Sequence, residues 1–229
     1  NKDECKRHFS VGSTFSFFLL QKKEYQNRTS LKNKQISGSI VCDTVDLEKM
    51  RFGAYPRDLS SVCCEIIEKT MNKSREKLGI INNTTHHSVH KDRWSLQKDK
   101  VFSHPIQNTP SKLYWFNSPH RDSGKIKLLI PTTTYFRRMM LTTHGTTQSF
   151  CYLLVPDQYD PEIVLNNVNN MLFDYINECF RYANWNSVPI LRSMPNLPLD
   201  KRLTDEDIFD YFSISDSERN HIRKTITWR

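Results

Sequence analysis

The stretches KIKLLIP, residues 125–131, and FCYLLV, residues 150–155, decide the fold class of this sequence. Each is a short apolar run, a pattern typical of a strand that is buried on at least one face of a sheet. The run KLYWF, residues 112–116, has the same character and is rich in aromatic residues, which favour strands. The sequence therefore predicts a sheet built from its middle third.

Helical periodicity flanks these strands. A helix is predicted to start at Asp58, with its apolar residues on one face and Gly79 placed to end it. A long second helix is predicted to start at Asp160, with Pro161 in its first turn and apolar residues at helical spacing as far as Phe180. The expected fold is mixed α/β: a mixed sheet with packed helices and a short helical C-terminal tail.

Further strands, a loop and a connector are predicted outside the central sheet and the two helices. Strands are predicted at residues 8–21 (HFSVGSTFSFFLLQ) and 37–44 (SGSIVCDT), and a polar loop at 82–91. Three prolines, Pro189, Pro195 and Pro198, favour an extended connector.

Two capping-box pairs near the C-terminus predict two short helices. Thr204 stands three residues before Asp207, and Ser215 three residues before Glu218. In each pair the hydroxyl can accept from the backbone while the carboxylate reaches back to the first residue.

Positive charge is concentrated in one zone of the sequence. Of the formal net charge of +8, an excess of seven falls within residues 91–138, which contain ten Lys or Arg and three acids. A smaller basic block spans residues 22–34, whereas residues 157–181 carry five acids and one arginine. This asymmetry favours a polyanion-binding face, because neutralising phosphates releases counterions. A well-solvated surface with no such ligand is the alternative.

Composition indicates a soluble, cytoplasmic protein without a membrane partner. The unbroken apolar stretch at residues 17–20 is far shorter than a bilayer requires, and no signal-peptide pattern opens the sequence. The six cysteines include no CxxC pair, so we expect reduced thiols.

Tests for catalytic and cofactor motifs give no match. The six glycines are isolated, which excludes a GxGxxG or P-loop cradle, and no serine lies in a GxSxG elbow. A zinc site at His86, His87, His90 and His104 lacks cysteines at familiar spacings. Pro156 and Asp157 begin a nuclease-like pattern that no downstream acid-x-Lys completes. We therefore assign no catalytic, metal or cofactor-binding residue to this chain.

Cations and aromatic residues alternate through the basic zone, which favours nucleic-acid binding because cations pair with phosphates and rings stack on bases. Among the cations, arginines suit base reading and lysines suit phosphate contacts. The turn of residues 145–149 can contact phosphates or only close a hairpin. The candidate DNA-binding residues are Lys91, Arg93, Trp94, Lys98, Lys100, Lys112, Arg121, Arg137, Arg138, Thr146, Thr147 and Gln148.

Two stretches resemble a known family. The run PNLPLDKRLTDEDIFDYFSISDSERNHIRKTI, residues 195–226, is similar to the closing segment of bacterial and phage adenine-N6 DNA methyltransferases of the restriction-modification type. In it a Leu-Pro stretch precedes Thr-Asp-Glu, an aromatic pair and a short helix. The matching residues are Leu197, Pro198, Thr204, Asp205, Glu206, Tyr211, Phe212, Ser217, Glu218 and Ile222. The run at residues 9–22 resembles the strand near the end of the catalytic domain in the same enzymes.

The resemblance implies a division of the chain and a function. Residues 1–50 would end the catalytic sheet, 51–195 would form the target-recognition domain, and 196–229 a helical tail. The family's aromatic-x-Gly-x-Gly cofactor loop and Asn-Pro-Pro-aromatic tetrapeptide appear nowhere in this sequence. We therefore expect a chain that binds double-stranded DNA but is inactive alone. A catalytic domain, upstream or on a partner chain, would use S-adenosylmethionine, and this chain would bind none.

Two alternatives remain open on the sequence. The chain can be an interaction or regulatory module whose basic face binds an acidic protein, or, with less support, a restriction nuclease.

Overall fold

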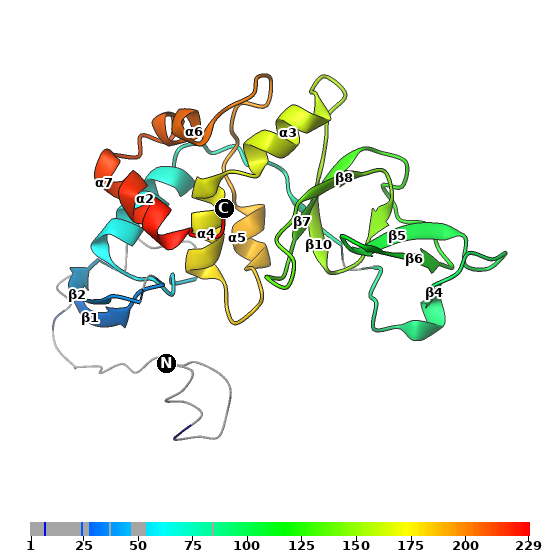
Figure 1. Ribbon diagram of the computed structural model, residues 1–229, viewed down its shortest axis with the longest axis horizontal. Helices are drawn as coiled ribbons and strands as arrows, with labels where there is room; N and C mark the ends of the chain where they lie inside the picture. Colours follow the sequence, from blue (N-terminus) through cyan, green and yellow to red (C-terminus); the bar gives the residue numbers. More distant parts are fainter. Residues whose placement is uncertain (1–6, 8–23, 25–27, 37, 47–53, 84) are drawn as a thin grey trace.

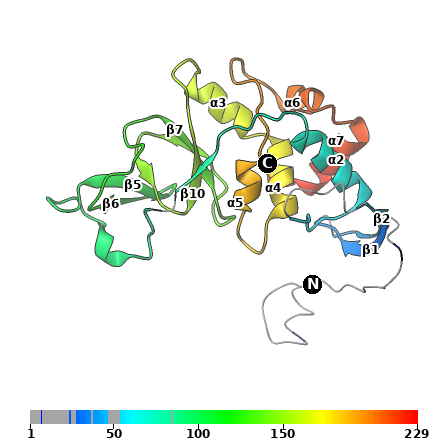
Figure 2. The same ribbon diagram turned by 180° about the vertical axis from the view of Figure 1, so that it is seen from behind.

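The structure is a computed structural model that describes residues 7, 24, 28–36, 38–46, 54–83 and 85–229. The described chain is a mixed α/β fold, as the sequence predicted. Most helices gather at one end of the molecule and two four-stranded sheets occupy the other (Figure 1). The reverse view shows the same separation (Figure 2).

The central sheet has the strand order β3-β10-β7-β8, and all neighbours are antiparallel. Its strands are β3 (Ile81–Asn82), β10 (Phe150–Leu154), β7 (Lys127–Pro131) and β8 (Met140–Thr142). Strands β7 and β10 confirm the two apolar stretches that predicted the sheet. Leu128 and Ile130 of β7 pack with the helices, while Leu129 packs on the opposite face with Phe150 and Tyr152. The sheet is therefore buried on both faces, which explains its continuous apolar sequence.

The second sheet, here called the distal sheet, has the order β4-β6-β5-β9. It contains β4 (Trp94–Ser95), β6 (Lys112–Phe116), β5 (His104–Thr109) and β9 (Gly145–Thr146), and the short 3-10 helix η2 (Lys91–Arg93) precedes it. Strand β9 runs parallel to β5 and the other pairs are antiparallel. A Cβ on Gly145 would lie 2.3 Å from Ile106 Cδ1 and 2.4 Å from His120 Cβ. Only glycine therefore fits where β9 joins the sheet.

The helical part packs around one large apolar core. It contains α2 (Ser61–Met71), α4 (Met171–Phe180), α5 (Val188–Arg192), α6 (Asp205–Tyr211) and α7 (Asp216–Thr225). Ile66, Ile176, Phe209 and Ile222, from four different helices, are almost completely buried there. Helices α6 and α7 of the C-terminal tail thus share a core with α2 and α4. Helix α3 (Pro161–Val168) lies beside the central sheet (Figure 1).

A β-hairpin of β1 (Thr29–Lys34) and β2 (Ile40–Val45) is attached to the start of α2. The Asp43 carboxylate accepts a 2.7 Å hydrogen bond from the Ser61 amide. Strand β2 agrees with the predicted strand at 37–44, whereas β1 lies in a segment interpreted only as a basic block. The predicted strand at 8–21 lies outside the described residues.

The first helix differs from its prediction at both ends. It starts at Ser61 because Ser60, not Asp58, caps it: the Ser60 hydroxyl accepts from the Cys63 amide. Asp58 is fully buried and instead accepts from the Ile36 amide. The helix ends at Met71 and is capped by Asn72, well before Gly79.

The long helix predicted from Asp160 is two helices, α3 and α4. Asn170 ends the continuity because its side chain accepts from the Phe173 amide and so caps α4. Asn167, at the end of α3, is fully buried and bonds to the backbone of Pro198, Lys201 and Leu203. Asparagine side chains thus replaced the backbone bonds of a continuous helix.

The prediction for Pro189 in the connector is wrong, whereas both predictions for the C-terminal tail are confirmed. Pro189 lies in the first turn of α5, a position that proline tolerates, and not in an extended segment. Both capping boxes, Thr204 with Asp207 and Ser215 with Glu218, are formed as predicted. Among the described cysteines, Cys42, Cys63, Cys64, Cys151 and Cys179 are free thiols. In the part of the chain that the structure describes, no helix combines the length and apolarity needed to cross a membrane.

Candidate nucleic-acid interface

The structure divides the candidate DNA-binding residues among four places. The first group lies on the distal sheet and its connections, Arg121 follows β6, and Arg137 and Arg138 precede β8 near the helical part. Thr146, Thr147 and Gln148 lie at the junction of β9 and β10. The distal-sheet group contains Lys91, Arg93, Trp94, Lys98, Lys100 and Lys112.

The cations of the distal sheet are exposed and have no acidic partner among the described residues. Within the described chain, none of Lys91, Arg93, Lys98, Lys100 and Lys112 forms an ion pair. The nearby Asp99 carboxylate instead accepts from the amides of Val101 and Phe102, at 2.8 Å and 2.6 Å. These side chains are therefore available to an external anion.

One stacked aromatic pair and one cation–aromatic contact support this surface. Trp94 stacks on Tyr114 with ring centroids 3.9 Å apart and planes 6° apart, and its Nε1 donates to the Ser88 carbonyl. On the other face of β6, Lys98 Nζ lies 5.3 Å from the centre of the Trp115 ring. Tyr114 therefore covers one face of the Trp94 ring, and the indole N–H is already bonded.

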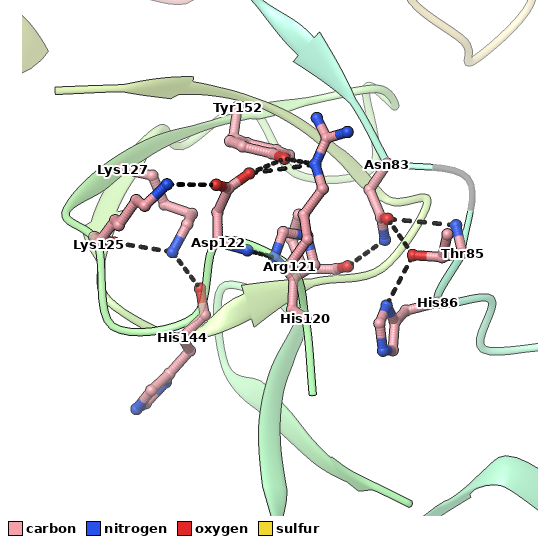
Figure 3. Close-up of polar contacts among 11 residues, drawn as sticks. Asn83, Thr85, His86, His120, Arg121, Asp122, Lys125, Lys127, His144 and Tyr152 are labelled. Carbon is pink, nitrogen blue, oxygen red and sulfur yellow. Dashed lines mark hydrogen bonds and ion pairs between the residues drawn. The ribbon is translucent and has the colours of Figure 1, made fainter. Parts of the chain in front are cut away.

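Arg121 is held at one end and free at the other (Figure 3). Its Nε lies 3.2 Å from Asp122 Oδ2 and 3.2 Å from the Tyr152 hydroxyl oxygen. Its two terminal nitrogens have no partner among the described residues and point away from the cluster (Figure 3). With 67% of the side chain exposed, the guanidinium presents a fixed, unoccupied fork.

Asp122 is the centre of this support. Its Oδ2 accepts a 2.7 Å hydrogen bond from the Tyr152 hydroxyl, and its Oδ1 accepts one of 2.9 Å from Lys125 Nζ. Burial by itself raises the pKa of Asp122, but the hydrogen bonds from Tyr152 and Lys125 outweigh it and lower the pKa to about 2. The carboxylate therefore stays ionised and keeps its attraction for Arg121 across physiological pH.

Lys127 and His120 lie beneath the Asp122 cluster. Lys127 is completely buried, and its ammonium donates to the carbonyls of Lys125, Thr143 and His144 at 2.8, 3.2 and 2.9 Å. Burial lowers the pKa of Lys127 to about 8. Lys127 was counted in the basic zone, but it joins the backbone around β7 and cannot reach a ligand.

His120 orients the turn that carries Arg121 and Asp122. Its Nδ1 accepts from the Asp122 amide at 3.1 Å, and its ring packs edge-on against Tyr152. Burial, with the nearby His86 and Lys127, lowers the pKa of His120 to about 4. The imidazole is therefore neutral near pH 7, as its role of hydrogen-bond acceptor at Nδ1 requires.

Several site predictions need correction. Thr146 and Thr147 are completely buried, and their hydroxyls bond to the Thr147 carbonyl and to Asn108 Oδ1, so neither reaches a phosphate. The side chain of Gln148 is occupied by both the amide and the hydroxyl of Ser88. The turn of residues 145–149 therefore joins the two sheets and closes no hairpin, because β9 pairs with β5 whereas β10 pairs with β3 and β7. Its polar side chains satisfy buried neighbours.

The two arginines before β8 lie apart from the distal sheet. Arg137 Nη1 is 3.5 Å from Glu178 Oε2, and its guanidinium lies 3.9 Å from the centre of the Trp228 ring. Arg138 is exposed and forms no ion pair with a described residue. Arg137 is thus engaged by the helical part, which leaves it poorly placed as a base reader.

The support for Arg121 was not predicted. Asp122 was counted only among the three acids of residues 91–138, and Tyr152 only as part of an apolar strand. One signal was present: a tyrosine within an otherwise apolar strand carries a hydroxyl that needs a buried partner. The partner itself, 30 residues away in sequence, could not be inferred.

Neither a search for metal-binding groups nor comparison with known proteins assigns a further function to the described residues. Among the residues that the structure describes, no three His, Cys, Asp or Glu side chains are grouped to hold a metal ion. Comparisons with protein-family models, with curated proteins and with solved structures find no significant match to this chain.

Proposed function

We propose that this chain binds double-stranded DNA across the distal sheet and reads a base with Arg121, as the target-recognition portion of an adenine-N6 DNA methyltransferase. The observation that carries the proposal is the Arg121 fork: Asp122 and Tyr152 fix its Nε, and its two terminal nitrogens have no partner among the described residues. Methyl transfer from S-adenosylmethionine would belong to residues outside this chain, either upstream or on a partner.

The fork suits guanine recognition. Two parallel N–H groups can bind O6 and N7 of guanine at once in the major groove, which lysine cannot do with the same geometry. Fixing Nε before binding reduces the side-chain entropy that is lost on association. The Arg121 fork is therefore suited to sequence discrimination as well as affinity.

The distal-sheet cations suit the phosphate backbone. Contacts to phosphates position a protein on the duplex without selecting a sequence, and they weaken as salt rises. Lys91, Lys98 and Lys100 have no competing acid among the described residues, so they can neutralise phosphates at no cost in internal ion pairs.

The resemblance of the C-terminal run to the closing segment of adenine-N6 methyltransferases supports placing this binding in a methylation system. The Leu197–Pro198 stretch and the Tyr211–Phe212 pair flank the first capping box of that run. The missing catalytic tetrapeptide supports a recognition role and not a complete enzyme.

Selection from a random-sequence duplex library tests the base-reading role. Arg121→Ala should weaken binding to the selected sequence by about 1 to 3 kcal/mol and relax preference at one base pair. Arg121→Lys should keep the charge but still relax that preference. Arg75→Ala, which removes an exposed arginine between α2 and β3, is the matched control and should change neither. Equal weakening of all sequences by Arg121→Ala would refute base reading at this residue.

Salt titration and a transfer assay test the rest of the proposal. Duplex affinity should fall steeply between low and physiological salt. A flat response, or no duplex binding, would favour an acidic protein as partner. The purified chain should transfer no label from radioactive S-adenosylmethionine to DNA, and detectable transfer would contradict a recognition-only role.

A further inference from the structure

An exposed aromatic turn lies between α4 and α5, away from the Arg121 cluster. Tyr182 and Trp185 are 66% and 45% exposed, although large aromatic side chains are normally buried. Their backbones exchange hydrogen bonds of 3.0 Å and 2.9 Å, and Ala183 between them has a φ of 47°. A non-glycine residue at positive φ is unfavourable, so the surrounding contacts hold this turn in place.

The end of β7 fixes the turn. The Thr134 amide donates to the Asn184 carbonyl and the Asn186 amide to the Thr132 carbonyl, both at 2.9 Å. The Asn186 side chain adds a 2.9 Å bond from Nδ2 to the Pro131 carbonyl. The two aromatic side chains are therefore presented from a rigid support.

A cavity of about 180 Å³ opens beside this turn. Tyr182 and Trp185 line it together with Asn82, Asn186, His87 and Thr132. Asn82 Oδ1 accepts from the Cys151 thiol, and Asn186 Nδ2 donates to Pro131. Asn82 Nδ2 and Asn186 Oδ1 have no partner among the described residues, which leaves one amide donor and one amide acceptor for a ligand.

We propose that this cavity, here called the amide–aromatic pocket, binds one unstacked nucleobase. Rings of tyrosine and tryptophan stack on bases whatever their identity. Paired amide donor and acceptor groups match the donor and acceptor pattern of a base edge. The inference rests on the proposed function because the base would come from bound DNA, one of whose bases leaves the stack.

A single-stranded oligonucleotide carrying one 2-aminopurine is a direct probe, because stacking on an aromatic ring quenches its fluorescence. The wild-type chain should quench it on titration. Trp185→Ala should weaken binding of the probe about 5- to 100-fold. Trp185→Phe should retain most of the quenching, since a ring is kept, and Asn82→Ala should weaken binding less than Trp185→Ala.

Tyr135→Ala is the matched control. Tyr135 is 75% exposed and close to the turn through a bond from Asn184 Nδ2, but it does not line the pocket. Its removal should leave quenching unchanged, and circular dichroism should show that all variants are folded. Equal quenching by wild type and Trp185→Ala, or no quenching by wild type, would overturn the proposal.

Fluorescence anisotropy of a fully paired duplex separates the two hypotheses. Trp185→Ala should still bind that duplex, because the distal sheet and Arg121 are intact. If the duplex binds but the probe is not quenched, the pocket proposal fails and the proposed function stands. If the probe is quenched but no duplex binds, the proposed function fails and base binding by the pocket stands.

Discussion

The helical part and the distal sheet use cations in opposite ways. In the helical part Glu178 is only 3% exposed and pairs with Arg57 at 2.9 Å, with Arg137 at 3.5 Å and with Arg181. Glu218, also 3% exposed, pairs with Lys69 at 2.7 Å. On the distal sheet the lysines have no acidic partner among the described residues.

This difference in pairing distinguishes the charges that stabilise the fold from those that are available to a ligand. A carboxylate removed from water needs a cation nearby, so Glu178 and Glu218 commit their partners to the interior. The Arg121 cluster is intermediate: Asp122 engages Nε of Arg121, while the terminal nitrogens have no partner in the described part of the chain. Charge counting along the sequence could not separate these roles.

The largest expected effect on stability comes from removing the buried carboxylate of Glu178 in the helical part. Glu178→Gln leaves Arg57, Arg137 and Arg181 without their shared carboxylate, so the free energy of unfolding should fall by about 2 to 4 kcal/mol. Urea denaturation measures it. Glu206→Gln is the control, because its carboxylate is 54% exposed where it pairs with Arg219 and Arg223. That control should lose less than about 1 kcal/mol, and equal losses would show that burial does not distinguish the two pairs.

The second effect is a loss of stability at acidic pH that we attribute to His120. Because the pKa of His120 is lowered from 6.5 to about 4, its neutral form stabilises the fold above pH 6.5. This stability is lost as the pH falls from 6.5 through 4, by up to about 3 kcal/mol. His120→Asn can still accept from the Asp122 amide but does not titrate, so its unfolding free energy should depend less on pH in this window. Identical pH profiles for the two proteins would rule out His120 as the titrating group.

A third, smaller effect on stability is expected from removing the charge of Asp122 in the Arg121 cluster. Asp122→Asn removes the charge that holds Arg121, Lys125 and Tyr152, and should cost about 1 to 2 kcal/mol of stability. Duplex selection should then show weaker base preference, while affinity for random duplexes is maintained because a negative charge is gone. Asp92→Asn removes one charge from the exposed η2 helix and should leave base preference intact. If both variants keep the wild-type preference, Asp122 does not position Arg121.

The smallest effect on stability is expected on the distal sheet. Replacing Lys91, Lys98 and Lys100 together by alanine should change the free energy of unfolding by no more than about 0.5 kcal/mol per site, since no ion pair is lost. The same variant should reduce the salt slope of duplex binding by about one per lysine. Lys69→Ala, which leaves the buried Glu218 without its lysine, should by contrast destabilise the fold. A destabilised triple variant would contradict the division drawn between the two regions.

Features that are encoded over a few neighbouring residues could be predicted from the sequence. The apolar runs became β6, β7 and β10 because short strands buried in a sheet need little more than continuous apolar character. Both capping boxes formed because each pair closes within three residues. The excess of cations in residues 91–138 was also fixed by composition.

The partners of the polar groups depend on the tertiary structure and could not be predicted from the sequence. Asn167 and Asn170 divided a periodic helix because their amides found long-range and capping partners. Thr146 and Thr147 entered the interior although their neighbours in sequence are polar. Tyr152 met Asp122 across 30 residues and Arg137 met Glu178 on another element, pairings that depend on how strands and helices pack. Local pattern fixes an element and its apolar face, whereas the partner of a charge depends on chain segments far away in sequence.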